Sequence, residues 1–332
     1  ADQLIQLTKD NDIISENMAP YPIYIAMLCL MWRELGDEKQ EKFKSLQTFS
    51  QIFDEMFEFL KVHYAQKEIT DLDSPSFQAY RSQIEKLMEP VAKVAFTGLQ
   101  ENTLSFKEGD FEQCSDSIET ACRVGVLSQE KKLSSIYDKS SMFLQSTIFF
   151  PHKLFQEYMA GVHLASLYEL DHNEFNRLIE QVVLPRKEEF RYLLYFTVSQ
   201  NKSIATHLIK SMLQRMPMHI ARNSQQEQIY FVVDVAFESQ DPDVAALVKD
   251  RVSSEEIELT ISTNTTAHTV AGYAFIGPHV VELCMGKDCG PTISIDVAEM
   301  ICSMPSLKEV SLHHGAYHDY FFATLARKGK ES

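Results

Sequence analysis

The chain has 332 residues, 45% of them apolar, and a formal net charge of −16. This length exceeds what one small core needs, so it predicts two or more domains. Non-specific binding to nucleic acid or to an anionic membrane surface requires a positive field, and the field of this chain is negative. We therefore expect no nucleic-acid partner.

Apolar runs and cysteines indicate a cytoplasmic protein. The longest apolar run, around IYIAMLCLMW, is about ten residues long, whereas a helix that crosses a bilayer needs about 20. No basic segment followed by an apolar one begins the chain, so nothing in it predicts secretion. The six cysteines are scattered, mostly within apolar helical patterns, which favours buried thiols in a reducing compartment. We expect no membrane span.

Helical patterns fill the N-terminal part of the chain. The segment 43–64 is the clearest, because its apolar residues recur at three- and four-residue spacing and line one face. The segment 18–35 is apolar almost all round, as buried helices are. An acidic linker, DLDSPS at 71–76, precedes a helix predicted over 77–97. A short helix within 1–15 is also predicted.

The pattern changes after these helices. TLSF predicts a short strand, two helices follow, and the second of them ends at Gly125. Two strand-like segments then flank the polar stretch SSIYDKSS, and the next helix starts near Pro151. The order helix, short strand, two helices, β-hairpin and helix predicts a winged helix.

A histidine precedes the most regular helix of this region, in the stretch FFPHKLFQEYMAGVHLA. Pro151 suits the first position of a helix, where a missing N–H costs nothing. His152 would then lie in the first turn, where unpaired N–H groups and the helix dipole favour an anion. A phosphate site and a capped helix start both remain open. The apolar stripe predicted for this helix consists of Leu154, Phe155, Tyr158, Met159, Val162 and Ala165.

The C-terminal half contains further helices and then short strands. Helical segments with short polar joins fill 167–256 and predict a stacked helical domain. IELTIS, HVVELCM and LKEVSL are strand-like, and VAEMICSMPSLKEVSL has the layout of one leucine-rich repeat. One well-formed unit predicts only the start of an array, since a solenoid needs about three or more repeats. We expect a mainly α protein with four domains: a first helical domain at 1–70, a winged helix at 77–166, a second helical domain at 167–256 and incipient leucine-rich repeats at 257–332.

This order of parts, together with two motifs, resembles the C-terminal half of the NACHT module of NOD-like receptors. These receptors are intracellular innate immune sensors of the STAND class of ATPases. The motifs are FPHKLFQEYMAG in the winged helix and, second in specificity, the Pro-led apolar run YPIYIAMLCLMW. The resemblance covers nearly the whole chain, although the segment 171–256 adds only general agreement.

The resemblance implies roles for two residues. Pro22 aligns with the proline that lies against the adenine of bound nucleotide. His152 aligns with the winged-helix histidine that contacts the β-phosphate of ADP and holds the receptor closed. The resemblance also implies ADP or ATP with Mg²⁺ in the intact receptor, an upstream nucleotide-binding domain of the same chain as partner, and a homo-oligomer on activation. On spacing alone, Pro22 is equally explained as the residue that starts a helix.

The sequence departs from the family pattern in one respect. It contains no G-x-x-x-x-G-K-[ST] motif and no apolar strand that ends in an Asp pair for Mg²⁺; in the family these elements lie upstream. Without a P-loop, we expect little nucleotide affinity, no hydrolysis and no bound cofactor for these residues alone. The sequence therefore predicts a non-enzymatic regulatory fragment of a receptor. The alternative is a helical interaction scaffold that never contacts nucleotide.

Other chemistry has less support in the sequence, which predicts neither catalytic residues nor metal ligands. His152 and His163 are three helical turns apart, or about 16 Å, which is too far to share a metal. His279, Cys284 and Cys289 fit no common zinc spacing, so core thiols are favoured. A small enzyme that used the His-rich segments would need a polar pocket with perturbed titratable groups.

Overall fold

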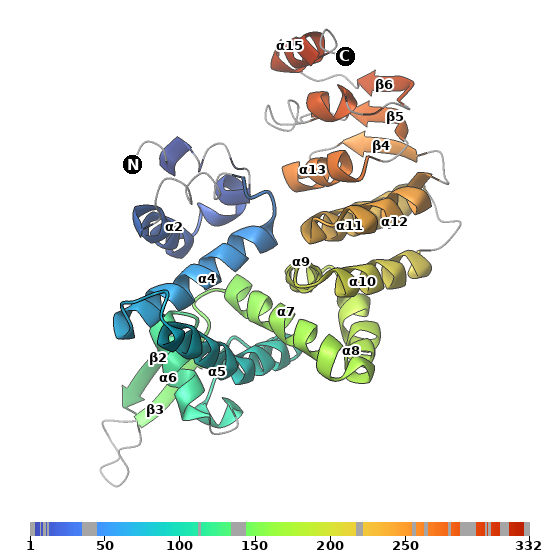
Figure 1. Cartoon of the computed structure of the whole chain (residues 1–332). Coiled ribbons are helices and arrows are strands. Elements are labelled where there is room, and N and C mark those ends of the chain that lie inside the picture. The colour runs from blue at the N-terminus through green and yellow to red at the C-terminus, as the bar shows by residue number, and fades with distance from the viewer. Residues whose placement is uncertain are drawn as a thin grey trace. The chain divides into compact units, whose positions relative to one another are not determined.

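The structure, a computed structural model, describes most of the chain. The described residues are 4–6, 8, 11, 13–34, 45–111, 114–133, 144–216, 222–253, 257–261, 265–277, 280–285, 297–302, 304, 307–312 and 319–328. They are mainly helical, which confirms the predicted fold class. The chain forms two compact units (Figure 1): unit 1 contains residues 1–49 and 201–332, and unit 2 contains residues 50–200. The four domain boundaries stay a prediction.

Helices make up most of unit 2, and local sequence signals explain several of their ends. The Ser74 hydroxyl accepts the Phe77 N–H at 3.2 Å, and Pro75 follows as the first residue of α5, two residues before the predicted start at 77. At the end of α6, Gly125 takes the left-handed conformation with φ of 96°, as predicted for this glycine. The helices are α4 (Phe49–Glu68), α5 (Pro75–Gln100), η2 (Glu108–Phe111), α6 (Ser115–Val124), α7 (Lys153–Leu170), α8 (His172–Leu178), η3 (Ile179–Val183), η4 (Leu184–Arg186) and α9 (Arg191–Ser199).

Unit 2 has the topology of a winged helix. Its antiparallel sheet has the order β1-β3-β2, with β1 at Ser105–Phe106, β2 at Ser128–Leu133 and β3 at Leu144–Phe149. Along the chain, α5, β1, η2 and α6 precede the β2–β3 hairpin, and α7 follows it (Figure 1). This element order is the predicted one. The polar stretch SSIYDKSS lies outside the described residues.

An aromatic cluster forms the core between α4, α7 and α9. The rings of Phe57 and Tyr158 stack with centroids 4.1 Å apart, and those of Phe53 and Phe196 are 4.9 Å apart. Phe155 joins the cluster at 5.4 Å from Phe57 and is fully buried. Each buried aromatic ring removes a large apolar area from water, so this cluster contributes strongly to the stabilisation of α7.

The start of α4 differs from the prediction. The apolar pattern predicted a helix from residue 43, but residues 45–48, directly before Phe49, are not helical. The Phe49 N–H donates to Oε1 of Glu238 at 3.1 Å, and this carboxylate is buried. A remote acidic group therefore caps the helix here, which no local pattern predicts.

Unit 1 contains helices from both ends of the chain. The described helix within 18–35 is buried on one face only, through Tyr24, Leu28 and Met31, while Cys29 is exposed. The prediction of a helix buried all round was therefore wrong.

No described helix has both the length and the apolar composition that crossing a bilayer requires. The helices of unit 1 whose bounds are described include η1 (Ile13–Met18), α2 (Pro22–Glu34), α10 (Lys202–Arg215), α11 (Arg222–Ser239), α12 (Pro242–Ser253), α13 (Ala267–Ile276) and α15 (Asp319–Lys328).

The second sheet is parallel, and it extends the predicted repeat. Strands β4 (Ile257–Ile261), β5 (Val280–Met285) and β6 (Glu309–Leu312) lie side by side in chain order (Figure 1). Leu259, Leu283 and Val310 are in register, 24 and 27 residues apart in the chain. That period falls within the 20 to 29 residues of leucine-rich repeats, each a strand plus a helix. Helix α13 follows β4, and residues 297–302 are helical before β6, so successive strand–helix units are present where the sequence predicted one.

Candidate functional site

His152 caps α7 rather than lying within its first turn. Its backbone is extended, with φ of −152° and ψ of 151°, and the helix begins at Lys153. The Leu154 N–H donates to Nδ1 of His152 at 3.2 Å. Pro151 therefore precedes the cap instead of occupying the first helical position. The prediction for Pro151 was wrong because the helix starts after a histidine cap. The His152 imidazole accepts an N–H of the first helical turn, and the proline, which has no N–H, lies outside the helix.

The cap fixes the chemistry of the imidazole. Accepting a hydrogen bond at Nδ1 requires a lone pair there, so the neutral ring carries its proton on Nε2. Burial lowers the pKa of His152 below its usual 6.5, which favours this neutral form near pH 7. The half-buried side chain thus presents an N–H donor at the N-terminus of an 18-residue helix, whose dipole favours an anion.

Pro22, the second predicted site residue, is the first residue of α2 and is exposed. This position is the one that proline prefers in helices, because the first N–H has no intrahelical partner. Pro22 lies in unit 1 and His152 lies in unit 2. The structure therefore defines the surroundings of each residue within its unit, and not the distance between the two residues.

Buried polar side chains on α7 were missed by the sequence analysis. Gln156 and Glu157 are buried, while Val162 and Ala165 of the predicted stripe are only half-buried. The first turns of α7 are enclosed by α4, α5 and α9, so the apolar stripe covers only part of the buried surface. The two polar residues between Phe155 and Tyr158 lie outside the predicted apolar stripe, and spacing alone gave no sign that they are buried.

Gln156 fixes the end of α5 to the turn before β1. Its Nε2 donates to the carbonyl oxygens of Ala95 and Thr103, at 3.1 and 3.0 Å. A Cβ at Gly98 would lie 2.6 Å from this nitrogen and 2.4 Å from the Phe106 ring, so only glycine fits there. Gln156 is therefore a structural residue of the winged helix, four residues after the His152 cap.

Two carboxyl groups, Glu157 on α7 and Asp54 beside it, have raised pKa values. Burial raises the pKa of Glu157 to about 7. It does so although Nζ of Lys153, whose positive charge lowers this pKa, lies 3.3 Å from Oε1 of Glu157. The Tyr158 hydroxyl donates to Oδ1 of Asp54 at 2.8 Å, and burial raises the pKa of Asp54. Perturbed titratable groups occur at functional sites, but they also occur in structural networks. These groups are enclosed among core aromatics, which favours the structural explanation.

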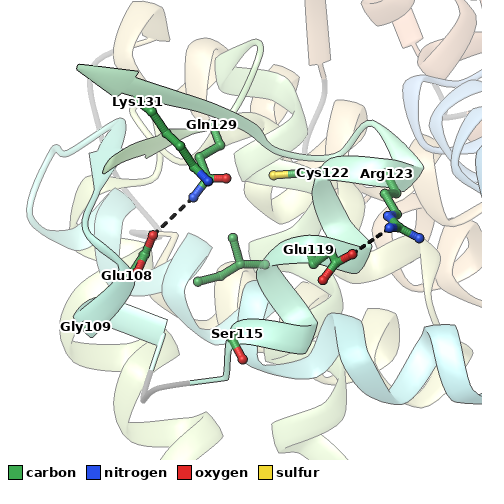
Figure 2. Close-up of a pocket in the computed structure, with 9 residues that line it drawn as sticks. Glu108, Gly109, Ser115, Glu119, Cys122, Arg123, Gln129 and Lys131 are labelled. Atoms are coloured by element: carbon green, nitrogen blue, oxygen red, sulfur yellow. Dashed lines mark hydrogen bonds and ion pairs between the residues drawn. The ribbon is translucent and has the colours of Figure 1, made fainter. Parts of the chain in front are cut away.

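A pocket of about 620 Å³ lies in the winged helix, between η2, α6 and β2. Figure 2 shows Gln129 and Lys131 reaching from β2 toward Glu108 of η2, with the Cys122 sulfur directed from α6 into the same region. One face of α6 lines the pocket through Ser115, Ile118, Glu119, Cys122 and Arg123. No motif in the sequence marks this site, because its residues come from three separate elements.

The zinc interpretation gains no support from the described residues. Cys284 is buried in β5, as a core thiol would be, whereas His279 and Cys289 lie outside the described residues. Among the residues that the structure describes, no group of three or more His, Cys, Asp or Glu is arranged to hold a metal ion.

No protein-family model matches the chain, and no curated protein is significantly similar to it. The resemblance to NOD-like receptors therefore depends on the sequence motifs and on the element order.

Proposed function

We propose that this chain is the regulatory part of a cytoplasmic NOD-like receptor. In this proposal the winged helix and the helical segments hold a nucleotide-binding domain of the same chain in an ADP-bound, closed state. Exchange of ADP for ATP with Mg²⁺ favours the open state, and the receptor then forms homo-oligomers that signal.

The observation that carries this proposal is the position of His152. It lies directly after the last strand of a winged helix and caps the helix that follows, with its side chain bonded to the Leu154 N–H. The resemblance assigns a β-phosphate contact to this residue. A neutral imidazole with its proton on Nε2 donates one hydrogen bond to a phosphate oxygen, while the helix dipole favours the negative charge.

The C-terminal part of the chain supports the same proposal. Parallel strands at a period of 24 and 27 residues follow the helices of the proposed second helical domain. A winged helix, a helical segment and strand–helix repeats thus occur in one chain, in the order that the resembled receptors have. In this proposal the chain contributes no catalytic group and acts through binding and conformational change.

The first test is to read the transcript upstream of the codon for Ala1. The proposal expects a Gly-rich loop with Gly-Lys-Ser/Thr, followed by a strand with an Asp pair, in the same reading frame. A stop codon, or an upstream frame with neither element, would overturn it. The chain would then be a helical interaction scaffold, and His152 would only cap a helix.

A second test separates the phosphate contact from the cap, in the complete protein that contains this chain. His152→Asp keeps a strong cap and suits the helix dipole, but its charge repels phosphate. His152→Ala removes both the cap and the contact, and losing the cap costs about 1 kcal/mol.

The expected result is that both variants lose copurified ADP, measured by chromatography of released nucleotide, and raise basal signalling. Only His152→Ala should lower the melting temperature. If His152→Asp retains ADP as the native protein does, His152 does not contact the diphosphate.

A further inference from the structure

The pocket in the winged helix has polar side chains at its rim and apolar groups beneath them. Ile118 is buried and Cys122 is half-buried, whereas Glu108, Gln129 and Lys131 are exposed. Burial raises the pKa of the Cys122 thiol, so it stays protonated near neutral pH and forms a weakly polar wall. An apolar floor with a few convergent polar groups, within about 300 to 1,000 Å³, is typical of small-molecule sites.

The charges of the rim fall into two classes. Arg123 and Glu119 neutralise each other in an ion pair of 2.7 Å on α6. Lys131 and Glu108 form no ion pair with each other or with any other described residue. The Glu108 carboxylate accepts only a neutral amide hydrogen bond, from Nε2 of Gln129 at 3.2 Å. With respect to the residues that the structure describes, the pocket therefore presents one uncompensated ammonium group and one uncompensated carboxylate.

Gln129 holds the Glu108 carboxylate in place. Its Nε2 also donates to the Ser146 hydroxyl at 2.7 Å, which fixes the amide between β3 and η2. Lys131 is two residues further along β2, so its side chain leaves the sheet on the same face as that of Gln129. Figure 2 shows both side chains directed toward Glu108, above the face of α6.

We propose that this pocket binds a small zwitterion with an apolar body, in the manner of an aromatic amino acid. The ligand carboxylate pairs with Lys131, the ligand ammonium pairs with Glu108, and the apolar body lies over Ile118 and Cys122. A simple anion would pair with Lys131 but would bring its negative charge close to the Glu108 carboxylate. A simple cation would pair with Glu108 but would bring its positive charge close to the Lys131 ammonium group. Nucleic acid is disfavoured by Glu108, Glu119 and the net charge of −16.

This inference does not depend on the proposed nucleotide switch, because none of its residues belongs to the His152 site. The test titrates three probes into the full 332-residue chain. They are L-tryptophan, tryptamine, which lacks the carboxylate, and indole-3-propionate, which lacks the ammonium group. Calorimetry or ligand-detected NMR gives the three dissociation constants.

Tryptophan is expected to bind about tenfold or more tightly than either analogue, because each charge pair contributes to its affinity. Lys131→Gln should abolish the preference for tryptophan over tryptamine and keep the preference over indole-3-propionate. Glu108→Gln should have the opposite effect. This crossed pattern distinguishes a built zwitterion site from general adhesion of indole to an apolar surface.

Lys86→Gln and Glu89→Gln make the same charge changes at exposed positions of α5 and serve as matched controls. They should leave all three affinities unchanged. All four positions are exposed, so circular dichroism should show the native fold in each variant. Equal affinity for the three probes, or no binding of tryptophan at its solubility limit, would overturn the proposal.

Discussion

Two ion pairs of unit 2 have the same helical spacing and opposite surroundings. Lys153 and Glu157 lie at i and i+4 on α7, 3.3 Å apart, and the Glu157 side chain is 2% exposed. Glu119 and Arg123 lie at i and i+4 on α6, 2.7 Å apart, and both side chains are more than half exposed, at 63% and 57%. These i, i+4 pairs on two helices of one unit therefore show how strongly burial affects a carboxylate beside a cation.

Desolvation decides the difference between these pairs. Water stabilises an exposed carboxylate and screens its partner, so a surface pair contributes little to stability. Burial removes that water, and the pKa of Glu157 rises to about 7 in spite of Lys153. Ionisation of Glu157 therefore affects the stability of the fold, whereas Glu119 and Arg123 on α6 stay in contact with solvent.

Truncating the core beside the buried pair should have the largest effect. Phe155→Ala removes a fully buried ring that contacts Phe53 and Phe57, and should lower the free energy of unfolding by about 3 to 5 kcal/mol. Denaturant unfolding measures the change. An unresolved change would show that α7 is not enclosed, and the comparison of the two helices would fail.

Glu157→Gln should sharpen the comparison through pH. Because its pKa is raised from 4.5 to about 7, native Glu157 holds its proton more tightly than the unfolded chain does. The native protein therefore loses stability as pH rises from 4.5 through 7, and the neutral glutamine does not. The free energy of unfolding of the variant, relative to that of the native protein, should rise by about 2 to 3 kcal/mol between pH 5 and pH 8.

Denaturant titrations of both proteins at the two pH values test this prediction. If the difference between the native protein and Glu157→Gln is constant across that range, Glu157 is ionised normally and is not desolvated.

Glu119→Gln is the matched change on α6 and should have the smallest effect. Its side chain is 63% exposed and its partner Arg123 reaches solvent, so both groups are hydrated whether or not the ion pair forms. No resolvable change in unfolding free energy is expected at pH 5 or pH 8. A pH-dependent loss like that of Glu157 would mean that the face of α6 is covered in solution.

Several elements could be predicted because their signals are local. Gly125 at the end of α6 and the apolar repeats of α4 and α5 act over single turns of helix, whereas the Ser74 cap was missed and α5 was predicted to start two residues too late. The winged-helix order followed from these ends and from the two strand-like segments. Helices α13 and α15 were missed: α13 is apolar on nearly every side, so it has no amphipathic stripe to detect.

The candidate site was only partly predictable. His152 was identified from its motif, but its role as a cap depends on backbone angles that spacing does not specify. The start of α4 depends on Glu238, which is 189 residues away in the chain. The pocket combines Glu108, Cys122 and Lys131 from three elements, and no sequence window contains such a combination as a pattern.

The sequence by itself determined the mainly helical class and the winged-helix order, because propensity and hydrophobic spacing act between near neighbours. Only the tertiary structure decided which charges lose their water. Glu157 and Glu119 occupy similar local contexts, and α4, α5 and α9 enclose one of them and not the other. Desolvation is set by this packing, so the pKa of a side chain and its availability to a ligand follow from the fold.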